Sequence, residues 1–236
     1  GLSRREGRFV VPVESAAGEP VVYEALTVLI ATGATHRHLG VPGEEEYYGR
    51  GVSYCATCAG PFFRGKRIVV VGGGDAACDE AGFLARLTDR VTLVHRRNKL
   101  RAQKALADRT LRNPHIAARF DTEVREIRGE PGPTGKVTSV IMENVKTGER
   151  EEFPCDAVFI FVGMEPQTAL ASLAKKDAAG YLVTDENMRT SIHGLLAAGD
   201  VRAKSFRQVV TAAADGAIAA HSASICIDEQ QCEANR

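Results

Sequence analysis

The alternation of apolar and polar positions is clearest in the middle of the chain. Residues 66–71 read "KRIVVV" and end in three glycines, a continuous apolar run typical of a strand buried on both faces of a parallel sheet. From residue 75 to about residue 87 apolar side chains recur at helical spacing, and residues 90–94 begin another apolar strand. The pattern predicts a strand, a tight turn, a helix and a strand, which together form one βαβ unit. The helical positions are Ala77, Ala81, Leu84 and Leu87.

The flanking segments predict further strands. The stretch "VVYEALTVLIATG" (21–33) predicts one strand that runs into Gly33, and the polar segment after it, with Pro42 and Gly43, predicts a linker or domain crossing. A helical stretch beyond Arg101 ends near Pro114. Three runs then predict a meander joined by turn clusters: "TEVREIRG", "KVTSVIMENV" and "EEFPCDAVFIFVG". The stretch "VGMEPQT" predicts a second crossing, "SIHGLLAAGD" a strand, and residues 207 to about 225 an Ala-rich helix.

Composition narrows the setting. The chain has 236 residues, of which 44% are hydrophobic and 25% charged, enough for a sizeable core in one large or two modest domains. Thirty basic and 30 acidic residues cancel, so no basic footprint indicates nucleic acid or an anionic membrane. Uninterrupted apolar runs stay below the roughly 18 residues of a membrane span, so we expect a soluble protein. Six cysteines are too few for a disulfide scaffold and indicate a reducing compartment.

The glycines after the first buried strand fit a dinucleotide fingerprint. Gly72, Gly74 and Ala77 match G-x-G-x-x-A, and Asp75 and Ala76 open the helix that follows. The helix start offers free backbone N–H groups to phosphate oxygens. The alternative is a glycine turn that binds nothing; the strand before it and the helix after it favour a nucleotide.

The end of the next strand selects the nucleotide. An NAD site usually places a carboxylate there, whereas this chain has His95, Arg96 and Arg97, followed by Arg101. Guanidinium groups bind a 2′-phosphate through charge-assisted hydrogen bonds, so we expect NADPH rather than NADH. Arg97 and Arg101 would share a face if a helix began there. The alternatives are a solvated basic patch and, for His95, either packing on the adenosine ribose or simply ending the strand.

The stretch "GVSYCATCAG" places Cys55 and Cys58 in a C-x-x-C loop. Such a loop can form and break a disulfide and can lower one thiol's pKa from about 8.5. Zinc is the alternative, but a structural zinc site needs four ligands, and the spacing of Cys226 and Cys232 is wider than is usual for zinc. We therefore expect a redox pair.

The other thiols and imidazoles carry weaker signals. Cys78 and Cys155 lie in apolar surroundings and read as buried packing residues. Five histidines have no carboxylate or thiol at a telling spacing, and we expect surface or hydrogen-bonded core roles for them: His36, His38, His115, His193 and His221.

Together these motifs resemble the low-molecular-weight thioredoxin reductases over nearly the whole chain. The matching stretches are "ATGATHRHLGVPG", "GVSYCATC", "VVVGGGDAA", "HRRNKLRAQK", "FVGMEPQT" and "GLLAAGDV", with "FRQVVTAAADG" after the last. The resemblance implies an α/β fold with two Rossmann-like dinucleotide-binding domains. An NADPH domain with the redox C-x-x-C, residues 37–162, would be inserted into an incomplete FAD domain, residues 1–36 and 163–236.

The resemblance also implies roles. Hydride would pass from NADPH to FAD, and electrons would pass from FAD to the disulfide and then to thioredoxin or a related dithiol protein. Cys58 would face the flavin and Cys55 would attack the partner, with hinges near Gly40 and Gly163. A cytoplasmic homodimer is implied. The implied FAD contacts are Thr32, Gly33, Gly199, Asp200, Arg207, Gln208 and Val209.

Two departures from the family pattern matter. No G-x-G-x-x-G precedes Ala31, so the turn that would hold the FAD pyrophosphate is missing, and we expect a fragment. The family has an acidic proton donor directly after the second redox cysteine, where this chain has Ala59. The open alternatives are a flavoprotein reductase for another dithiol or a peroxidase, a fragment that binds NADPH without turnover, and a zinc-stapled α/β interaction module.

Overall fold

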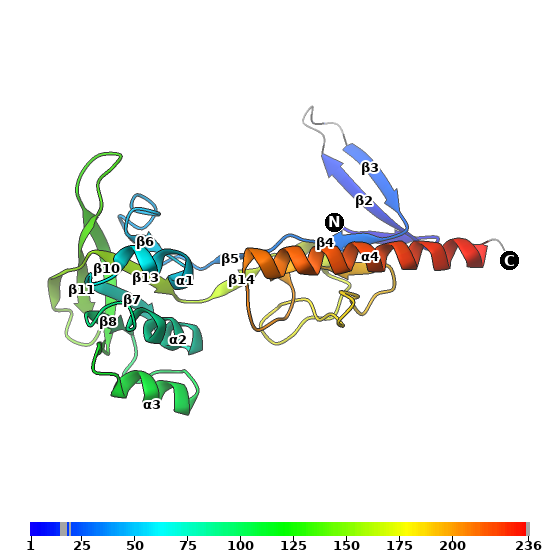
Figure 1. Cartoon of the computed structure of the whole chain (residues 1–236). Helices are drawn as coiled ribbons and strands as arrows, with labels where there is room; N and C mark the ends of the chain where they lie inside the picture. The colour runs from blue at the N-terminus through cyan, green and yellow to red at the C-terminus, as the bar shows by residue number, and fades with distance from the viewer. Residues whose placement is uncertain (15–17, 19, 235–236) are drawn as a thin grey trace. The chain divides into compact units, whose positions relative to one another are not determined.

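The chain folds into two compact units, coloured along the sequence in Figure 1. The computed structural model describes residues 1–14, 18 and 20–234, with side chains as far as Gln230. Unit 1 consists of Gly1–Thr35 and Met164–Arg236, and unit 2 is His36–Gly163. Unit 2 is therefore an insertion between two parts of unit 1.

Unit 2 is built on a five-stranded parallel sheet with strand order β6-β13-β7-β8-β9. The predicted βαβ unit is confirmed as β7, α2 and β8, except that the helix ends at Leu84 rather than near Leu87. A second helix, α3 (Lys104–Arg112), packs against α2. The elements of the sheet and its first helix are β6 (Val52–Ser53), β7 (Ile68–Gly72), α2 (Asp75–Leu84), β8 (Val91–Val94), β9 (Ile116–Arg119) and β13 (Ala157–Phe161).

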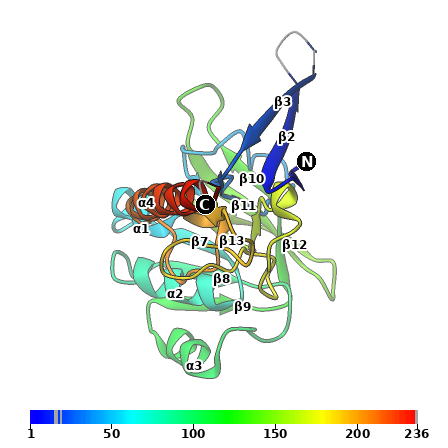
Figure 2. The same ribbon diagram turned by 90° about the vertical axis from the view of Figure 1, so that its right-hand side faces the viewer.

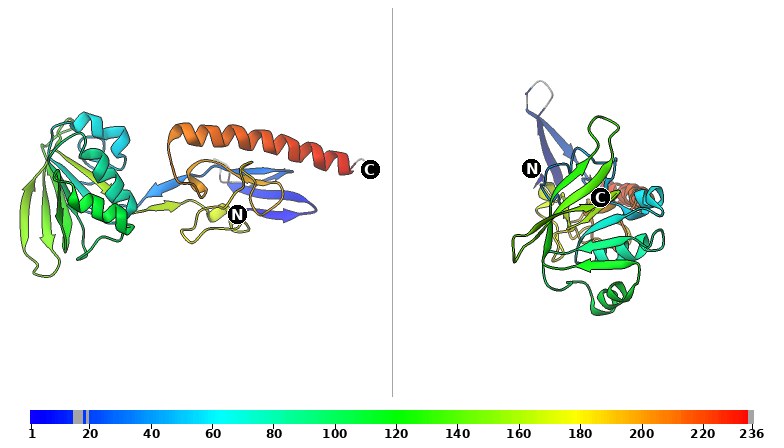
Figure 3. Two further views of the ribbon diagram at one scale, coloured as in Figure 1. Left: turned by 60° about the horizontal axis from the view of Figure 1, so that its bottom comes forward. Right: turned by 90° about the vertical axis from the view of Figure 1, so that its left-hand side faces the viewer.

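Alternate residues of each strand pack into two different cores, as period-two side-chain geometry requires. In β7, Ile68 and Val70 face Ala81 and Leu84 of α2. Val69 and Val71 instead pack with side chains of the meander, such as Met142. Unit 2 therefore has three layers, which can be followed in Figure 3: the helices, the parallel sheet and the antiparallel meander. Because both faces are covered, all five β7 residues are buried, and this is why the strand reads as an unbroken apolar run.

The predicted meander is confirmed, but its last stretch is two strands rather than one. β10 (Thr122–Gly129), β11 (Val137–Asn144) and β12 (Arg150–Pro154) form an antiparallel sheet, and β13 belongs to the parallel sheet. The break falls at Asp156, whose Oδ2 accepts hydrogen bonds from Arg67 N at 2.8 Å and Arg67 Nε at 3.1 Å. These hydrogen bonds between distant residues lie at the point where the chain leaves the antiparallel sheet and enters the parallel sheet.

Unit 1 contains an antiparallel sheet of β1 (Ser3–Arg5), β2 (Arg8–Glu14) and β3 (Pro20–Ala25), whose hairpin is prominent in Figure 2. The expected single strand over residues 21–33 is wrong. Residues up to Ala25 pair with β2, whereas β4 (Val28–Ile30) pairs in parallel with β15 (Leu195–Ala197). The break allows the chain to change sheets, and Val28 N donates to Gly194 O at 2.9 Å as the new pairing begins.

Helix α4 (Val209–Ala234) is the longest element of the described chain. The window Val209–Gln230 is long and apolar enough to cross a membrane by length and composition. This window was not expected from the sequence, because polar residues interrupt its apolar positions and leave no long unbroken apolar run. α4 packs against β4 and β15, and 22% of the window is buried.

The remaining short elements connect these layers. β5 and β14, where the chain crosses between the units, form a two-stranded sheet. Their bounds and those of the other short elements are β5 (Ala34–His36), α1 (Ala56–Ala59), η1 (Gly60–Phe63), β14 (Met164–Pro166), η2 (Ala169–Ala171) and η3 (Gly199–Val201).

Candidate active site

The carboxyl edge of the parallel sheet gathers the predicted groups of unit 2. Since β6, β13, β7 and β8 are parallel neighbours in this order, their carboxyl ends lie side by side along one edge. The C-x-x-C loop follows β6, the glycine turn follows β7 and the basic stretch follows β8. Ligands of open α/β sheets bind outside such an edge. The structure therefore places a disulfide and a nucleotide fingerprint on the same face of one unit.

The glycine turn has the geometry that the fingerprint requires. Gly72 has φ of +155°, and a Cβ there would lie 2.5 Å from Phe161 O and 2.7 Å from Ala77 Cβ, so helix and strand approach too closely for a side chain. A Cβ at Gly74 would meet nothing within 4 Å. Gly74 is therefore not needed for packing, which leaves open space where a phosphate would approach the backbone.

Two hydrogen bonds hold the basic loop against this turn. Arg101 N donates to Gly73 O at 2.7 Å, and Gln103 N donates to Asp75 Oδ1 at 2.7 Å. The Asp75 carboxylate thus positions the loop. Arg97 and Arg101 would share a face only if a helix began there, and α3 begins only at Lys104, so this condition is not met.

A cavity of about 380 Å³ opens beside the turn and brings together several of the predicted residues. Gly72, His95, Arg96 and Arg101 line it, together with Gly73. The other predicted nucleotide residues lie outside this lining: Gly74, Asp75, Ala76, Ala77 and Arg97. Arg37 also lines the cavity and was missed, because nothing in the local sequence connects the linker to the glycine turn.

His95 is an unsatisfied group in this cavity. Its ring is 6% exposed and packs so closely on Gly73 that a Cβ there would lie 2.3 Å from the ring. Among the described side chains, its Nε2 is one of the buried polar atoms with no hydrogen-bond partner. Burial and the neighbouring Arg101 and Arg97 lower the pKa of His95. A neutral imidazole with an open nitrogen fits the polar edge of a nucleotide.

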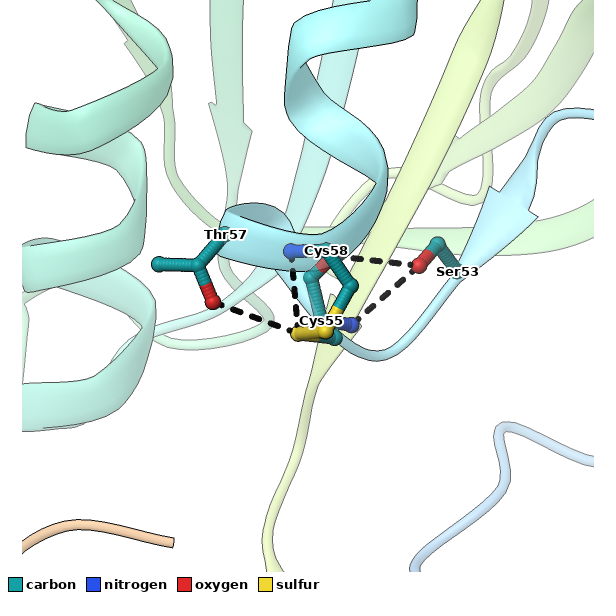
Figure 4. The surroundings of a disulfide bond; sticks show 4 residues. All are labelled: Ser53, Cys55, Thr57 and Cys58. Atoms are coloured by element: carbon teal, nitrogen blue, oxygen red, sulfur yellow. Dashed lines mark hydrogen bonds between the residues drawn. A yellow bond between two sulfur atoms is a disulfide. The ribbon is translucent and has the colours of Figure 1, made fainter. Parts of the chain in front are cut away.

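The redox pair lies at the start of α1 (Figure 4). Cys55 and Cys58 form a disulfide with a Cα–Cα distance of 5.3 Å. Cys55 Sγ accepts hydrogen bonds from Cys58 N at 3.2 Å and from the Thr57 hydroxyl at 3.3 Å. Ser53 Oγ accepts from Cys55 N at 3.2 Å and fixes the entry to the loop. Cys58 and Thr57 are exposed, and Cys55 is half-buried.

A polar network holds the linker next to this loop. Glu44 is 2% exposed, and its carboxylate accepts from Leu39 N at 2.9 Å, Gly40 N at 2.7 Å and the Tyr54 hydroxyl at 2.7 Å. Burial alone would raise the pKa of Glu44, but these hydrogen bonds outweigh it and lower the pKa. The Tyr54 hydroxyl also lies 2.8 Å from His38 Nδ1. The sequence analysis did not predict this network, although Glu44 lies only four and five residues from its two backbone donors.

The residues expected at a flavin gather in unit 1 at the ends of β4 and β15. Thr32 and Gly33 follow β4, and Gly199 and Asp200 follow β15, so parallel pairing brings the two turns together. Asp200 Oδ1 and Arg207 Nε are buried and have no hydrogen-bond partner among the described residues, although Lys204 Nζ lies 3.7 Å from that carboxylate oxygen. These orphaned atoms fit a polar ligand. Gln208 and Val209 come next, where α4 begins.

The remaining thiols fall into two groups. Cys78 and Cys155 are free and buried as expected, and burial raises their pKa, that of Cys155 to about 12. Cys226 lies 3.5 Å from His193 Nε2, a pairing that the sequence did not reveal. The side chain of Cys232 lies outside the described residues. Within the described part of the chain, no group of three or more His, Cys, Asp or Glu could hold a metal ion.

Proteins of known family are similar to this chain over nearly its whole length. Residues 2–216 match the pyridine nucleotide-disulphide oxidoreductase family. The thioredoxin reductase of Treponema pallidum (strain Nichols) is 62% identical over 230 residues, which are 98% of this chain and 72% of the relative. The chain belongs to the pyridine nucleotide-disulphide oxidoreductases and, within them, to the thioredoxin reductases. The thioredoxin reductase of Listeria innocua serovar 6a (strain ATCC BAA-680 / CLIP 11262) is 50% identical over 208 residues, 88% of this chain and 64% of the relative.

Solved thioredoxin reductases share the fold. The enzyme from Streptococcus pyogenes MGAS5005 has a TM-score of 0.86 at 46% identity, covering 97% of this chain and 72% of that one. The enzyme from Giardia duodenalis has a TM-score of 0.87 at 36% identity, covering 96% of this chain and 73% of that one. Thioredoxin reductases are NADPH-dependent flavoprotein disulfide reductases, so FAD and NADPH are the cofactors of the family to which the chain belongs. The chain spans 72% and 64% of the two curated relatives above.

Proposed function

We propose that the chain carries the electron path of a thioredoxin-disulfide reductase, from NADPH through FAD to the Cys55–Cys58 disulfide and on to thioredoxin. One observation carries this proposal. The disulfide follows β6, and the nucleotide cavity lies at the ends of β7 and β8 on the same sheet edge. Family membership supports the direction of electron flow, because the relatives are named thioredoxin reductases.

Unit 2 would bind NADPH through its own residues. The glycine turn would leave backbone N–H groups facing the pyrophosphate, with Gly74 providing the open approach. Arg96 and Arg101 would bind the 2′-phosphate at the end of β8, because they line the cavity there. The nicotinamide half would then point along the edge towards β13 and β6, where the disulfide lies.

Unit 1 would hold FAD through Asp200 and Arg207, whose buried polar atoms lack partners. Bound FAD would supply the chemistry of taking a hydride and releasing an electron pair. Thr32, Gly33, Gly199, Gln208 and Val209 would complete this side of the site, as the family pattern implies. Cys58 would face the flavin, and Cys55 would attack the disulfide of the partner.

We further propose a cytoplasmic homodimer, on the strength of the family resemblance. Three buried thiols without a disulfide partner, Cys78, Cys155 and Cys226, suit a reducing compartment. Light scattering of the purified protein tests the dimer, and a mass equal to one chain would contradict it.

The electron path is tested by following NADPH consumption with FAD in excess and oxidised thioredoxin as acceptor. We expect consumption that depends on thioredoxin and is abolished by Cys55→Ser, with Thr134→Val, in the exposed turn between β10 and β11, as a control that keeps both thiols. Consumption that persists in Cys55→Ser would contradict the path through the disulfide. Turnover with another dithiol protein or a peroxidase, but not with thioredoxin, would support the alternative partner.

A second candidate function is NADPH binding without turnover. It is favoured by the position of the nucleotide cavity, which is lined only by residues of unit 2 at the carboxyl edge of the parallel sheet. Binding of NADPH together with no flavin uptake at saturating FAD would select this candidate.

A further inference from the structure

We propose that the Thr57 hydroxyl is a catalytic group that stabilises the Cys55 thiolate when the disulfide is reduced. Thr57 occupies the second middle position of the C-x-x-C loop, and its Oγ1 lies 3.3 Å from Cys55 Sγ (Figure 4). The role in turnover rests on the proposed function, whereas the effect on the thiolate rests on the loop alone.

The direction of this hydrogen bond is fixed by the chemistry. A disulfide sulfur carries no proton, so the Thr57 hydroxyl must donate and Cys55 Sγ must accept. Cys58 N–H donates to the same sulfur at 3.2 Å. Two donors therefore point at Cys55. Both come from residues of the loop itself, so they remain beside the sulfur after the bond breaks.

The two hydrogen-bond donors become important when the Cys55–Cys58 disulfide is reduced. Two electrons and one proton convert the disulfide into one thiolate and one thiol, and the S–S bond breaks. When the electron pair enters at Cys58, Cys55 Sγ leaves with the bonding pair as a thiolate. Hydrogen bonds to an ionised group are roughly twice as strong as neutral ones, so donors that are weak in the disulfide strengthen as charge develops on Cys55.

The same two donors stabilise the charge on Cys55 that Ala59, the residue after the loop, cannot neutralise by giving a proton. Ala59 has no proton to give, and its N–H is already donated to Cys55 O at 3.1 Å. With Ala at this position, Cys55 would be held as a hydrogen-bonded thiolate rather than as a protonated thiol. A thiolate is the form that attacks a disulfide, and Cys55 is therefore ready for thiol–disulfide exchange with the partner.

The test measures the thiolate directly and needs neither flavin nor NADPH. In a Cys58→Ser background, the protein is reduced with dithiothreitol, and the rate of iodoacetamide alkylation of the Cys55 peptide is followed by mass spectrometry as a function of pH. Thr57→Val removes the hydroxyl and keeps the branched shape, and Thr57→Ser keeps the hydroxyl. Thr134→Val, in the exposed turn between β10 and β11, is the matched control.

We expect Thr57→Val to shift the alkylation profile of Cys55 to higher pH and to slow alkylation at neutral pH about tenfold, the size expected for one hydrogen bond to a charged group. Thr57→Ser should retain the original profile, and Thr134→Val should not change it. An unchanged profile in Thr57→Val, or an equal shift in Thr57→Ser, would overturn the proposal. Neither result depends on whether the chain turns over NADPH.

Discussion

At the scale of single residues, the arginines of the basic loop lead to a test of which nicotinamide nucleotide the chain prefers. All three arginines are exposed, but Arg96 and Arg101 line the cavity and Arg97 does not. We predict that Arg96→Ala and Arg101→Ala each weaken NADPH binding about ten- to a hundredfold while changing NADH binding little, since each removes a charge-assisted hydrogen bond to the 2′-phosphate. Arg97→Ala should have the smaller effect. Fluorescence titration with both nucleotides measures this, and equal losses for NADPH and NADH would assign the arginines to structure.

The residue after the redox loop gives a second prediction. Ala59→Asp would add a proton donor beside the thiolate that disulfide reduction creates, and general acid catalysis typically contributes 10²–10⁴-fold to such a step. With FAD in excess, we predict at least about tenfold faster dithiol formation and an unchanged rate of hydride transfer from NADPH, because only dithiol formation consumes the proton. Stopped-flow measurement separates the two steps, with Ala59→Asn as the control that cannot donate a carboxyl proton. Equal rates in both variants would show that the proton comes from elsewhere.

At the scale of elements, the glycine turn separates packing from ligand approach. Gly74 has φ of −95° and ψ of −173°, which alanine adopts without strain, and a Cβ there would meet no atom within 4 Å. We therefore predict that Gly74→Ala keeps the unfolding temperature but weakens NADPH and NADH alike, by about tenfold or more, because the methyl group would occupy the approach to the pyrophosphate. Gly82→Ala, which also meets nothing within 4 Å but lies inside α2, is the matched control. Unchanged affinity in Gly74→Ala would place the pyrophosphate elsewhere.

The contact between α4 and the turn after β15 rests on one carboxylate. Asp215 is 8% exposed and accepts from Gly199 N at 3.1 Å, Arg202 Nη1 at 2.9 Å and Lys204 Nζ at 3.0 Å. Burial opposes ionisation, but these hydrogen bonds outweigh it and lower the pKa of Asp215. We predict that Asp215→Asn lowers the free energy of unfolding by about 3 kcal/mol at neutral pH, because two cations lose their counter-charge.

The pH dependence of that loss has a definite sign. Since the folded pKa of Asp215 lies below its unfolded value of about 3.9, the carboxylate stabilises the fold fully above that value, and the stabilisation declines as the pH falls through the folded pKa. Urea unfolding at neutral and acidic pH should therefore show the gap between Asp215→Asn and the parent protein closing in acid. Asp228→Asn, exposed on the same helix, is the control. A gap that stays constant with pH would contradict the ionic origin.

The sequence predicted those elements whose pattern of apolar residues and glycines lies within one continuous stretch of the chain. The βαβ unit could be predicted because β7 is buried on both faces and α2 follows its glycine turn directly. The two strands expected as single runs could not be divided from the sequence, because the break at Asp156 depends on Arg67 far away in the chain, and the break before Val28 depends on pairing with β15. In the site, the C-x-x-C and the glycine turn carry fixed spacings. Glu44, His38 and Arg37 meet their neighbours only through folding, and no spacing reveals them.

At the scale of the two units, the proposed function places the glycine turn and the basic loop for NADPH in unit 2. These 236 residues contain no second G-x-G-x-x-G for the FAD pyrophosphate. We predict that the 236-residue chain, purified without added cofactor, shows little flavin absorbance and still binds NADPH in a fluorescence titration. Asp200→Asn should reduce whatever flavin is taken up when FAD is added, and it should leave NADPH affinity unchanged. Full flavin occupancy of the purified chain would contradict the prediction.

The insertion of unit 2 has a consequence for how such a chain can be rearranged. Its two ends are held together, because Arg37 N donates to Gly163 O at 3.0 Å. An inserted domain whose first and last residues lie close together can be replaced by another domain, and the sequence of the domain that carries it stays the same on both sides of the insertion. Unit 2 can therefore be exchanged as one segment. Under the proposed function, the residues that select the coenzyme and the redox disulfide would be exchanged together, while both parts of unit 1 keep their sequence.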